Sequence, residues 1–444
     1  MSEGRSILKF KAHLDLATLT LYSPLYLLVV FGLFFIQGGF SLLVGYLLLL
    51  TIASFRAERS TEIQSTIPSL RFALLVPAYN EERLLPGLLN SLRRLDYPDD
   101  LYEIHVVADN CTDQTALMAE RHGGCAHVRE DISNRGKGPA LQWLFERVQS
   151  TGKPFDAVVI LDADSVVNPE FLKVMATHLQ RGERVIQAYY AVRNSVGSWS
   201  SSLRSAAFAV LHYLRPLGRM ALGGSVGLKG NGMVFASEVF NRYRWSASIT
   251  EDIELHMRLI LDGERVTFAP DAVVLGEMPD SLADSESQHD RWERGRIQML
   301  RRYVPELAQK SCAELTTGKL KRAYLFFDAL MEHLIPPFAL LFGLNVGFLM
   351  LNLVVFLIGW QSGAVPAAST TAWLVSLNLL LSVFLLLGQT FYVITGLKLT
   401  HASREIYMGL LYSPAYMAWK FVQYGRILLK RDQLEWVRTR RNGG

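Results

Sequence analysis

The sequence predicts an α/β domain with a mainly parallel sheet, inserted between N-terminal and C-terminal membrane-spanning helices. Between residues 68 and 310, short apolar runs alternate with amphipathic stretches, which is typical of strands covered on both faces by helices. The segments before and after this region are far more apolar. In addition, one buried strand ends in Asp162-Ala163-Asp164, at the sheet edge where open α/β sheets bind ligands.

Residues 1–60 are predicted to form an N-terminal transmembrane hairpin. The run from Leu14 to Phe55 contains one acidic residue and no basic residue. About 40 residues suit two spans of about 20 residues each, and we place the break at Gln37-Gly38-Gly39. A signal peptide would be shorter, with a small-residue cleavage site after one apolar core. We therefore expect an uncleaved anchor.

Residues 311–444 are predicted to hold two further spans, interfacial helices and a basic cytosolic tail. The runs Pro337–Trp360 and Trp373–Leu397 carry no charge over more than 20 residues each. Basic residues follow the second run and fill the tail at 430–441, so the positive-inside rule places them in the cytosol. The apolar stretch Glu405–Trp419 is short and has basic flanks, which favours an interfacial or re-entrant helix. We expect an integral protein of the inner or plasma membrane with a cytosolic middle domain.

The net charge and the cysteine content limit the classes of function that the chain can have. The net charge is only +4, and the basic residues gather near the membrane junctions, which predicts contact with lipid headgroups and no nucleic-acid partner. The three cysteines, Cys111, Cys125 and Cys312, are odd in number and lack metal-ligand spacing. They fit a reduced cytosolic domain without disulfides.

Polar residues follow three of the first four predicted strands of the middle domain. The strands are expected at Phe72–Val76, Glu103–Ala108, Ala126–Val128 and Ala157–Leu161. The polar groups that follow them are Asn80 and Glu82 after the first strand, Asp109 after the second, and Asp162 and Asp164 after the fourth. Because the carboxyl ends of parallel strands meet at one edge, these groups should share one crevice.

The carboxylates of Asp162 and Asp164 predict a divalent cation. Residues two apart in a strand point to the same side, and two nearby carboxylates repel unless one is protonated or a cation lies between them. Oxygen-only ligands suit Mg²⁺ or Mn²⁺, although a lone pair of this kind is equally a strand end before a solvated turn. The segment Gly136-Lys137-Gly138 is too short for a phosphate-binding loop. Lys137 is either a phosphate or uracil contact or an ordinary solvated lysine.

Later segments add candidate acceptor and catalytic residues. A strand at Val185–Val192 and an amphipathic helix from about Trp199 to Leu214 precede five glycines within ten residues. Glycines at this density indicate either close backbone approach to a sugar ring or a mobile loop. The candidate acceptor residues there are Gly230, Asn231 and Gly232.

Two acidic residues begin the next predicted helix. Thr250-Glu251-Asp252 precedes the helical pattern Ile253–Leu261, so it is either a helix cap or the position of a carboxylate base. Gln288, Arg291 and Trp292 then supply an amide, a permanent cation and a flat ring. They suit the mouth of a cleft, although tryptophan and arginine also favour a membrane interface.

The segment from about residue 70 to residue 310 resembles a membrane-integrated family-2 glycosyltransferase of the GT-A (Rossmann-like) fold. Members of this group share a D, D, D, QxxRW pattern. This group includes cellulose synthase-like, poly-N-acetylglucosamine synthase-like and lipid-glucosylating members. The matching elements, in order, are Pro77-Ala78-Tyr79-Asn80-Glu81, Asp109, Asp162-Ala163-Asp164, Thr250-Glu251-Asp252, and Gln288, Arg291 and Trp292. One departure is Asn110-Cys111-Thr112-Asp113, where the family more often has Gly-Ser-Thr-Asp, so the turn after Asp109 is expected to differ in shape.

The resemblance implies a role for each candidate residue. The uracil of a UDP-sugar would bind at Asp109, the ribose near Asp162, and Mg²⁺ or Mn²⁺ at Asp164. Asp252, beside Glu251, would be the general base. The remaining donor-binding candidates are Pro77, Tyr79, Asn80, Glu81 and Lys137, together with Gln288, Arg291 and Trp292, which would hold the diphosphate and, through Trp292, the acceptor.

The resemblance also implies the reaction. It predicts inverting transfer of glucose or N-acetylglucosamine to a membrane-associated acceptor, preferably a lipid, to give a β-glycoside. The alternative is a processive polysaccharide synthase, to which Asn345, Asn352, Asn378 and Gln389 in the spans would contribute polar groups and an accessory membrane subunit could complete a channel. A transporter or receptor with a nucleotide-binding domain is disfavoured, because the spans lack internal repeats and paired charges.

Overall fold

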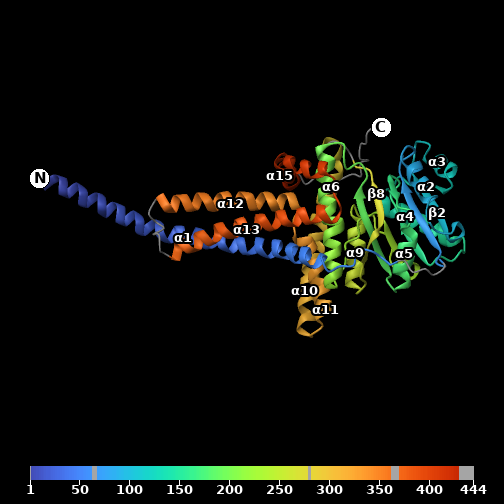
Figure 1. Cartoon of the computed structure of the whole chain (residues 1–444), viewed down its shortest axis with the longest axis horizontal. Helices are drawn as coiled ribbons and strands as arrows, with labels where there is room; N and C mark the ends of the chain where they lie inside the picture. The colour runs from blue at the N-terminus through green and yellow to red at the C-terminus, as the bar shows by residue number, and fades with distance from the viewer. Residues whose placement is uncertain (1, 63–67, 279–281, 362–369, 430–444) are drawn as a thin grey trace. The chain divides into compact units, whose positions relative to one another are not determined.

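The computed structural model describes residues 2–62, 68–278, 282–361 and 370–429. The chain divides into two compact units. The helical unit comprises Met1–Leu48 and Ile335–Tyr392, and the sheet unit comprises Leu49–Leu334 and Val393–Gly444. Figure 1 shows the helices and strands of both units.

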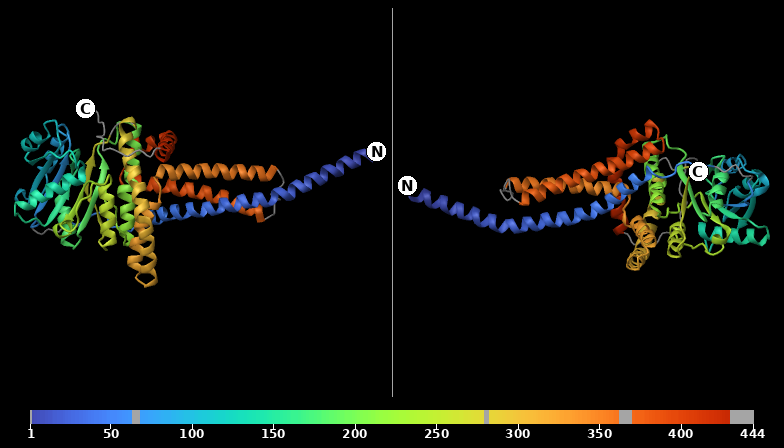
Figure 2. Two further views of the ribbon diagram at one scale, coloured as in Figure 1. Left: turned by 180° about the vertical axis from the view of Figure 1, so that it is seen from behind. Right: turned by 60° about the horizontal axis from the view of Figure 1, so that its bottom comes forward.

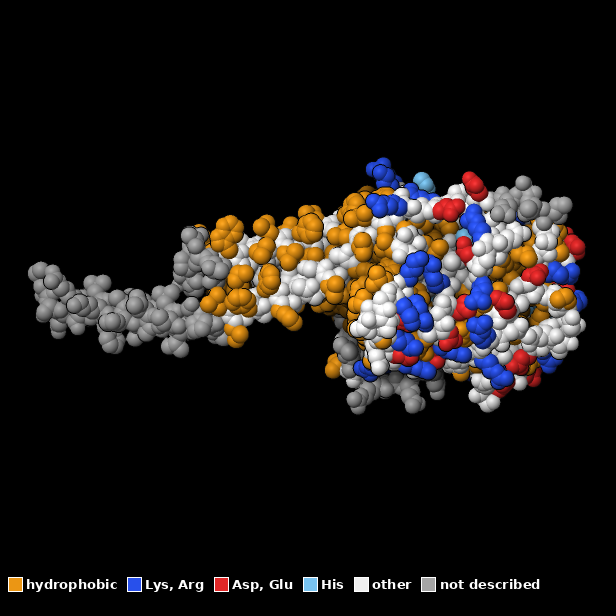
Figure 3. Space-filling view, turned by 90° about the horizontal axis from the view of Figure 1, so that it is seen from below, with side chains coloured by type: hydrophobic (Ala, Val, Ile, Leu, Met, Phe, Trp, Pro, Cys, Tyr) orange, Lys and Arg blue, Asp and Glu red, His pale blue; other side chains and the backbone are white. Residues whose placement is uncertain are grey.

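The helical unit is built from α1 (Ser2–Ser54), α12 (Phe338–Gln361) and α13 (Thr370–Leu399). Among the described residues, three helical segments are long and apolar enough to cross a membrane: Tyr26–Ser54, Phe338–Gln361 and Ala372–Leu399. Figure 3 shows hydrophobic side chains along the outside of these helices. Between them lie hydrogen-bonded polar side chains, such as Gln37, whose amide donates to Ser382 Oγ at 3.1 Å. Small polar groups of this kind join helices within a bilayer.

The predicted N-terminal hairpin is wrong, because residues 2–54 form one helix. Gly38 and Gly39 keep a helical backbone, and neither has the positive φ that a tight reversal would use. A glycine costs a helix about 0.5–1 kcal/mol, whereas a break in an apolar segment leaves several backbone groups without partners. Continuing the helix is therefore favoured. Within its described residues the structure thus offers three candidate spans, where the sequence predicted four.

Helices are present where the sequence predicted the two C-terminal spans and the interfacial stretch. The two predicted spans correspond to α12 and α13. The predicted interfacial stretch forms α14 (Arg404–Gly409), a short 3₁₀ turn η3 (Leu410–Tyr412) and the beginning of α15 (Ser413–Leu429). Its place at a membrane surface and the domain boundaries at residues 60, 68 and 310 stay predictions. The basic tail at 430–441 lies outside the described residues.

An eight-stranded sheet forms the centre of the sheet unit, in the order β3-β2-β1-β4-β7-β6-β8-β5. The strands are β1 (Phe72–Ala78), β2 (Tyr102–Asp109), β3 (Cys125–Arg129), β4 (Ala157–Ile160), β5 (Ser165–Val167), β6 (Val185–Val192), β7 (Met233–Ala236) and β8 (Thr267–Gly276). The first four run parallel, as predicted. The sheet as a whole is mixed, because β7 runs antiparallel to β4 and β6, and β5 antiparallel to β8.

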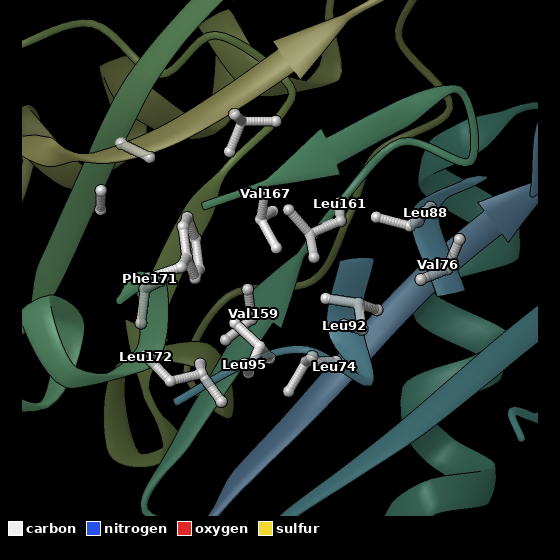
Figure 4. Packing of buried hydrophobic residues seen from close by; sticks show 14 of the residues in the cluster. Leu74, Val76, Leu88, Leu92, Leu95, Val159, Leu161, Val167, Phe171 and Leu172 are labelled. Carbon is white, nitrogen blue, oxygen red and sulfur yellow. The ribbon is translucent and has the colours of Figure 1, made fainter. Parts of the chain in front are cut away.

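Helices cover both faces of this sheet (Figure 1, Figure 2). One face packs against α2 (Leu85–Leu92), α3 (Thr115–Arg121) and α5 (Phe171–Gln180). The other face packs against α4 (Lys137–Ser150), α7 (Arg215–Leu222), α8 (Ser237–Phe240) and α9 (Glu251–Leu261). Figure 4 shows the first core, where Leu74, Val76 and Val159 from the strands meet Leu88, Leu92 and Phe171 from the helices. Burial of both faces explains the nearly continuous apolar strands.

The remaining helices of the sheet unit are η1 (Asp99–Leu101), α6 (Trp199–Phe208), the π-helical segment η2 (Ala209–Leu214), α10 (Leu282–Thr316) and α11 (Leu320–Leu334). The predicted amphipathic helix at 199–214 is therefore α6 continued by η2. Helices α10 and α11 pack against α9 through Met257, Met299 and Phe326. A Cβ on Gly295 of α10 would lie 2.3 Å from Thr250 Cγ2. Glycine thus lets α10 approach the segment before α9 closely.

Candidate active site

A pocket of about 440 Å³ lies in the sheet unit where β1, β2 and β4 end. Most of the candidate residues line it: Pro77, Tyr79, Glu81, Asp109, Lys137, Asp162, Asp164, Gly230, Glu251, Asp252, Gln288, Arg291 and Trp292. Three candidates, Asn80, Asn231 and Gly232, are not among the residues that line it. The carboxylates predicted to converge therefore do so, although they come from segments far apart in the sequence.

Asp109 ends β2 and is 7% exposed. Its Oδ1 accepts a hydrogen bond from Arg129 Nη1 at 2.5 Å, while Arg129 Nη2 donates to Asp131 Oδ2 at 2.8 Å. Burial raises the pKa of Asp109, and the Arg129 guanidinium opposes that rise. The sequence analysis missed Arg129. It is paired with Asp109 in the parallel register of β2 and β3, so extending the third predicted strand by one residue would have found it.

Two asparagines shape the turns beside Asp109. Asn80 and Asn110 have φ values of 55° and 51°, in the left-handed region that asparagine enters more readily than most residues. Asn80 Oδ1 accepts from the N–H of Thr112 at 2.8 Å, and Asn110 Oδ1 accepts from the N–H of Asp131 at 2.9 Å. Asn110 thus takes a conformation that glycine adopts without strain. Asn80, predicted to contact the donor, joins the β1 and β2 turns.

Lys137 and Asp162 form an ion pair at the pocket wall. Lys137 is the first residue of α4, and its ammonium donates to Asp162 Oδ1 and, at 2.6 Å, to the carbonyl of Gly230. It is therefore not the solvated loop lysine that the sequence left open. Its charge also offsets some of the repulsion between the Asp162 and Asp164 carboxylates.

Asn231 and Gly232 are buried in the sheet unit. The Asn231 side chain accepts from the N–H of Asp162 at 3.1 Å and donates to Ser165 Oγ at 2.7 Å. It therefore holds the turn that carries the Asp162 and Asp164 carboxylates. A Cβ on Gly232 would lie 2.8 Å from Val274 Cγ2, so this glycine is required by core packing. Neither residue has the position expected of a direct acceptor contact.

Glu251 and Asp252 begin α9 and form an acidic pair. Burial and the neighbouring Asp252 raise the pKa of Glu251 to about 7, against the opposing charge of Lys137. Burial also raises the pKa of Asp252, and Lys137 again opposes the rise. Asp252 Oδ1 accepts from the N–H of Ile253 at 2.8 Å. Thr250, which precedes the helix, makes no side-chain cap, so this helix N-terminus offers a pair of carboxyl groups that titrate nearer neutrality than usual.

Gln288, Arg291 and Trp292 lie on α10 at positions i, i+3 and i+4. This spacing puts them on one face of a helix, and all three line the pocket. Gln288 Oε1 is buried and has no hydrogen-bond partner among the described residues. Trp292 therefore faces the candidate site, and the alternative of a tryptophan that serves only a membrane interface is not supported.

Four further pocket residues had no clear sequence signal: Arg135, Tyr190, Lys229 and Glu277. Lys229 lies within the glycine-rich segment, and its Nζ is 3.4 Å from Glu332 Oε1. Glu277 directly follows β8. The prediction from the sequence compared the ends of the first four strands only. Residues near β6 and β8 were therefore not considered.

The family model described as "Glycosyltransferase like family 2" matches residues 68–295, which is more than half of the chain. The chain belongs to this family.

The family-2 chain is similar to several characterised or named proteins. It is 28% identical over 283 residues to a beta-monoglucosyldiacylglycerol synthase of Synechocystis sp., covering 62% of this chain and 57% of that protein. It is 22% identical over 314 residues to the probable glycosyltransferase YdaM of Bacillus subtilis, covering 69% and 70%. A mannosyltransferase from Pyrobaculum calidifontis in complex with GDP-Man and Mn²⁺ has a TM-score of 0.46 and 17% identity, covering 82% and 97%.

The pocket of this family-2 chain offers oxygen ligands for a divalent cation. Asp164 and Glu277 both line it, and carboxylates suit Mg²⁺ or Mn²⁺. Among the described residues, no three carboxylate, histidine or cysteine ligand atoms meet within 4.8 Å in this pocket. A donor set of one or two carboxylates is what Mg²⁺ uses when phosphate oxygens and waters complete its shell. The residues therefore fit a cation that binds together with a diphosphate.

Proposed function

We propose that this chain transfers a sugar, glucose or N-acetylglucosamine, from a UDP-sugar to a hydroxyl of a membrane lipid and inverts the anomeric configuration to give a β-glycoside. The observation that carries the proposal is the single pocket that Asp109, Asp164, Asp252 and the Gln288-Arg291-Trp292 face line together. The names of the Synechocystis and Nostoc relatives, both beta-monoglucosyldiacylglycerol synthases, support a lipid acceptor and a β-linkage.

The donor would lie along the strand ends. Uracil would bind beside Asp109, which Arg129 holds in place, and the ribose beside Asp162. The diphosphate would lie between Asp164 and Arg291, both of which line the pocket. A bound Mg²⁺ or Mn²⁺, held by Asp164, would neutralise charge on the diphosphate. Arg291 would stabilise the negative charge that grows on the leaving UDP.

Asp252 would act as the general base. The anomeric carbon becomes oxocarbenium-like as the bond to UDP breaks, while Asp252 takes the proton from the attacking hydroxyl. A base works best when its pKa is close to the operating pH, and burial raises the pKa of Asp252 in that direction. Attack from the face opposite UDP in a single displacement inverts the configuration. Trp292 and the backbone of Gly230, which lie at the same pocket, would position the acceptor.

A processive polysaccharide synthase is the second candidate, and the helical unit favours the lipid reading. The polar side chains that the sequence left available for a channel are buried between its helices. Asn345 Nδ2 donates to Gln389 Oε1 at 3.4 Å, and Asn352 Nδ2 donates to Ser382 Oγ at 3.2 Å. These groups are used in helix packing. A glycan path would therefore need residues from an accessory membrane subunit.

We place the sheet unit in the cytosol, where nucleotide sugars are made.

The proposal predicts lipid-dependent release of UDP. The purified full chain in bilayers should release UDP from UDP-glucose or UDP-N-acetylglucosamine only when the bilayer contains a lipid with a free hydroxyl, such as diacylglycerol. Mass analysis of the lipid fraction should show one added hexose or N-acetylhexosamine. A polymer in the aqueous fraction would favour the processive alternative. No UDP release with either donor across lipid compositions would contradict the proposal.

Replacing Lys137 with alanine should shift the acid side of the activity profile to higher pH. The Lys137 charge lowers the pKa of both Glu251 and Asp252, so removing it raises both pKa values further. Since the base acts only when ionised, activity should then be lost at a higher pH as the solution is acidified. Initial rates from pH 5 to 9 measure this shift. Lys321→Ala, an exposed lysine on α11, is the control, and an unchanged or lowered acid limb in Lys137→Ala would contradict the argument.

A further inference from the structure

A second cluster of ligand-type side chains lies away from the active-site pocket, on β2 and β3. It consists of His105, Cys125 and His127, whose nitrogen and sulfur atoms all lie within 4.8 Å of one another. His105 pairs with Cys125 in the parallel register of the two strands, and Val107 pairs with His127. Because side chains alternate along a strand, all three project from the same face. None of them lines the active-site pocket.

The spacing of the donor atoms matches tetrahedral zinc. His105 Nδ1 and His127 Nε2 are 3.3 Å apart. Zinc binds histidine nitrogen at about 2.0–2.1 Å, so two such ligands at a tetrahedral angle are roughly 3.3–3.4 Å apart. A hydrogen bond between the two rings would account for that one distance. It would not account for the thiol of Cys125 as a third donor beside them.

We propose that His105, Cys125 and His127 bind Zn²⁺ with a water as fourth ligand, at a site separate from the active site that fastens the edge strand β3 to β2. Two imidazoles and a thiolate form a borderline-soft donor set that suits zinc and disfavours the oxygen-seeking Mg²⁺. Cys125 is exposed and His105 is 4% exposed, so the site is open to solvent on the thiol side and buried on the other. A water ligand has access from the open side.

The surroundings of the cluster suit an imidazole ligand. Glu103 Oε2 lies 3.3 Å from His105 Nε2, the arrangement in which a carboxylate orients a metal-binding histidine. Lys153 pairs with the same carboxylate at 2.6 Å. His105 Nε2 is thus held by Glu103, while His105 Nδ1 stays 3.3 Å from His127 Nε2.

The site has a consequence for the edge of the sheet. Among the strands that the structure describes, β3 pairs only with β2, and its last residue, Arg129, forms the ion pair with Asp109. A metal that joins the beginning of β3 to β2 would stabilise the strand that positions this arginine. Because a ligand that binds only the folded state stabilises it, the unfolding temperature should rise with zinc.

Cobalt uptake tests the site in the full-length protein. The protein is first treated with a chelator, and the chelator is then removed. It is next titrated with Co²⁺ in the presence of excess Mg²⁺, which occupies the oxygen-rich active site. The expected result is one equivalent of Co²⁺ with a thiolate-to-cobalt charge-transfer band, which one equivalent of Zn²⁺ displaces. Cys312→Ser, at an exposed cysteine on α10, should behave like the unmodified protein. Absence of the band in the unmodified protein overturns the proposal by itself.

Variants at the cluster separate this site from weak surface binding. Cys125→Ser should lose the charge-transfer band, and His127→Ala should bind Zn²⁺ at least about 10-fold more weakly, as expected when a ligand is removed. Both positions lie on the partly exposed strand β3, and far-ultraviolet circular dichroism of the metal-free proteins checks that the fold is retained. Retention of the band in Cys125→Ser would overturn the proposal. The test does not depend on sugar transfer, so its outcome is distinct from that of the proposed function.

Discussion

Replacing Asp252 with asparagine should abolish sugar transfer while leaving UDP-sugar binding intact. Asparagine keeps the size of the side chain and an oxygen that can still accept from the N–H of Ile253, as Asp252 Oδ1 does at 2.8 Å. It cannot accept the proton of the attacking hydroxyl. Loss of a general base costs about 10²- to 10⁴-fold in rate. Initial rates of lipid glycosylation and calorimetric titration with UDP-sugar measure the two effects separately.

Two further variants sharpen this assignment. Asp100→Asn, at an exposed acid on η1, should leave the rate unchanged. Glu251→Gln distinguishes the two carboxyl groups of the pair. Burial is the main cause of the raised pKa of Asp252, so Asp252 stays available as the base in this variant, and transfer should slow far less than in Asp252→Asn. If Glu251→Gln is the inactive variant and Asp252→Asn turns over normally, Glu251 is the base and the assignment is reversed.

The sequence predicted the first half of the sheet well because each strand there has a strong local pattern. The runs Phe72–Val76 and Ala157–Leu161 are apolar throughout, and polar residues follow each within a few positions. They form β1 and β4, which pair in parallel as predicted for the sheet. Parallel order then predicted correctly that the Asp109 and Asp164 carboxylates would lie at one pocket.

The predictions that failed concern how segments pair over long distances. The antiparallel β7 (Met233–Ala236) follows the glycine-rich segment, and its four residues resemble any short apolar run. At the N-terminus, the length of the apolar block fitted two spans, while the structure continues a single helix through Gly38 and Gly39. The length and composition of a segment indicate how many spans it could form. They do not show whether the chain reverses at a glycine pair or continues through it as a helix.

The cluster of His105, Cys125 and His127 could not be recognised from the spacing of these residues along the chain. Cys125 and His127 are two residues apart, and His105 lies twenty residues earlier on another strand. No sequence motif marks such a set, because the strand register of β2 and β3 brings the donors together. The motif-based residues of the pocket were found for the opposite reason: each is tied to a strand end or a helix N-terminus that the local sequence already predicts.

Replacing Asp164 with alanine should remove the dependence of UDP-sugar binding on a divalent cation. Asp162 is already paired with Lys137, so Asp164 is the carboxylate of this turn that we assign to the cation. Even loss of an outer-shell partner weakens metal sites by about 10- to 100-fold, and loss of a direct ligand should cost at least as much. Calorimetry with UDP-sugar, with and without Mn²⁺, measures the effect.

The comparison forms a thermodynamic cycle between the cation and the side chain. In the unmodified protein, adding Mn²⁺ should tighten UDP-sugar binding strongly, whereas in Asp164→Ala it should change binding little. With chelator present, the two proteins should bind equally weakly, which shows that the pocket itself is intact. Asp100→Ala should keep the full response to Mn²⁺. If Asp164→Ala keeps it as well, then another group at the pocket, such as Glu277, holds the cation, and the assignment of Asp164 is wrong.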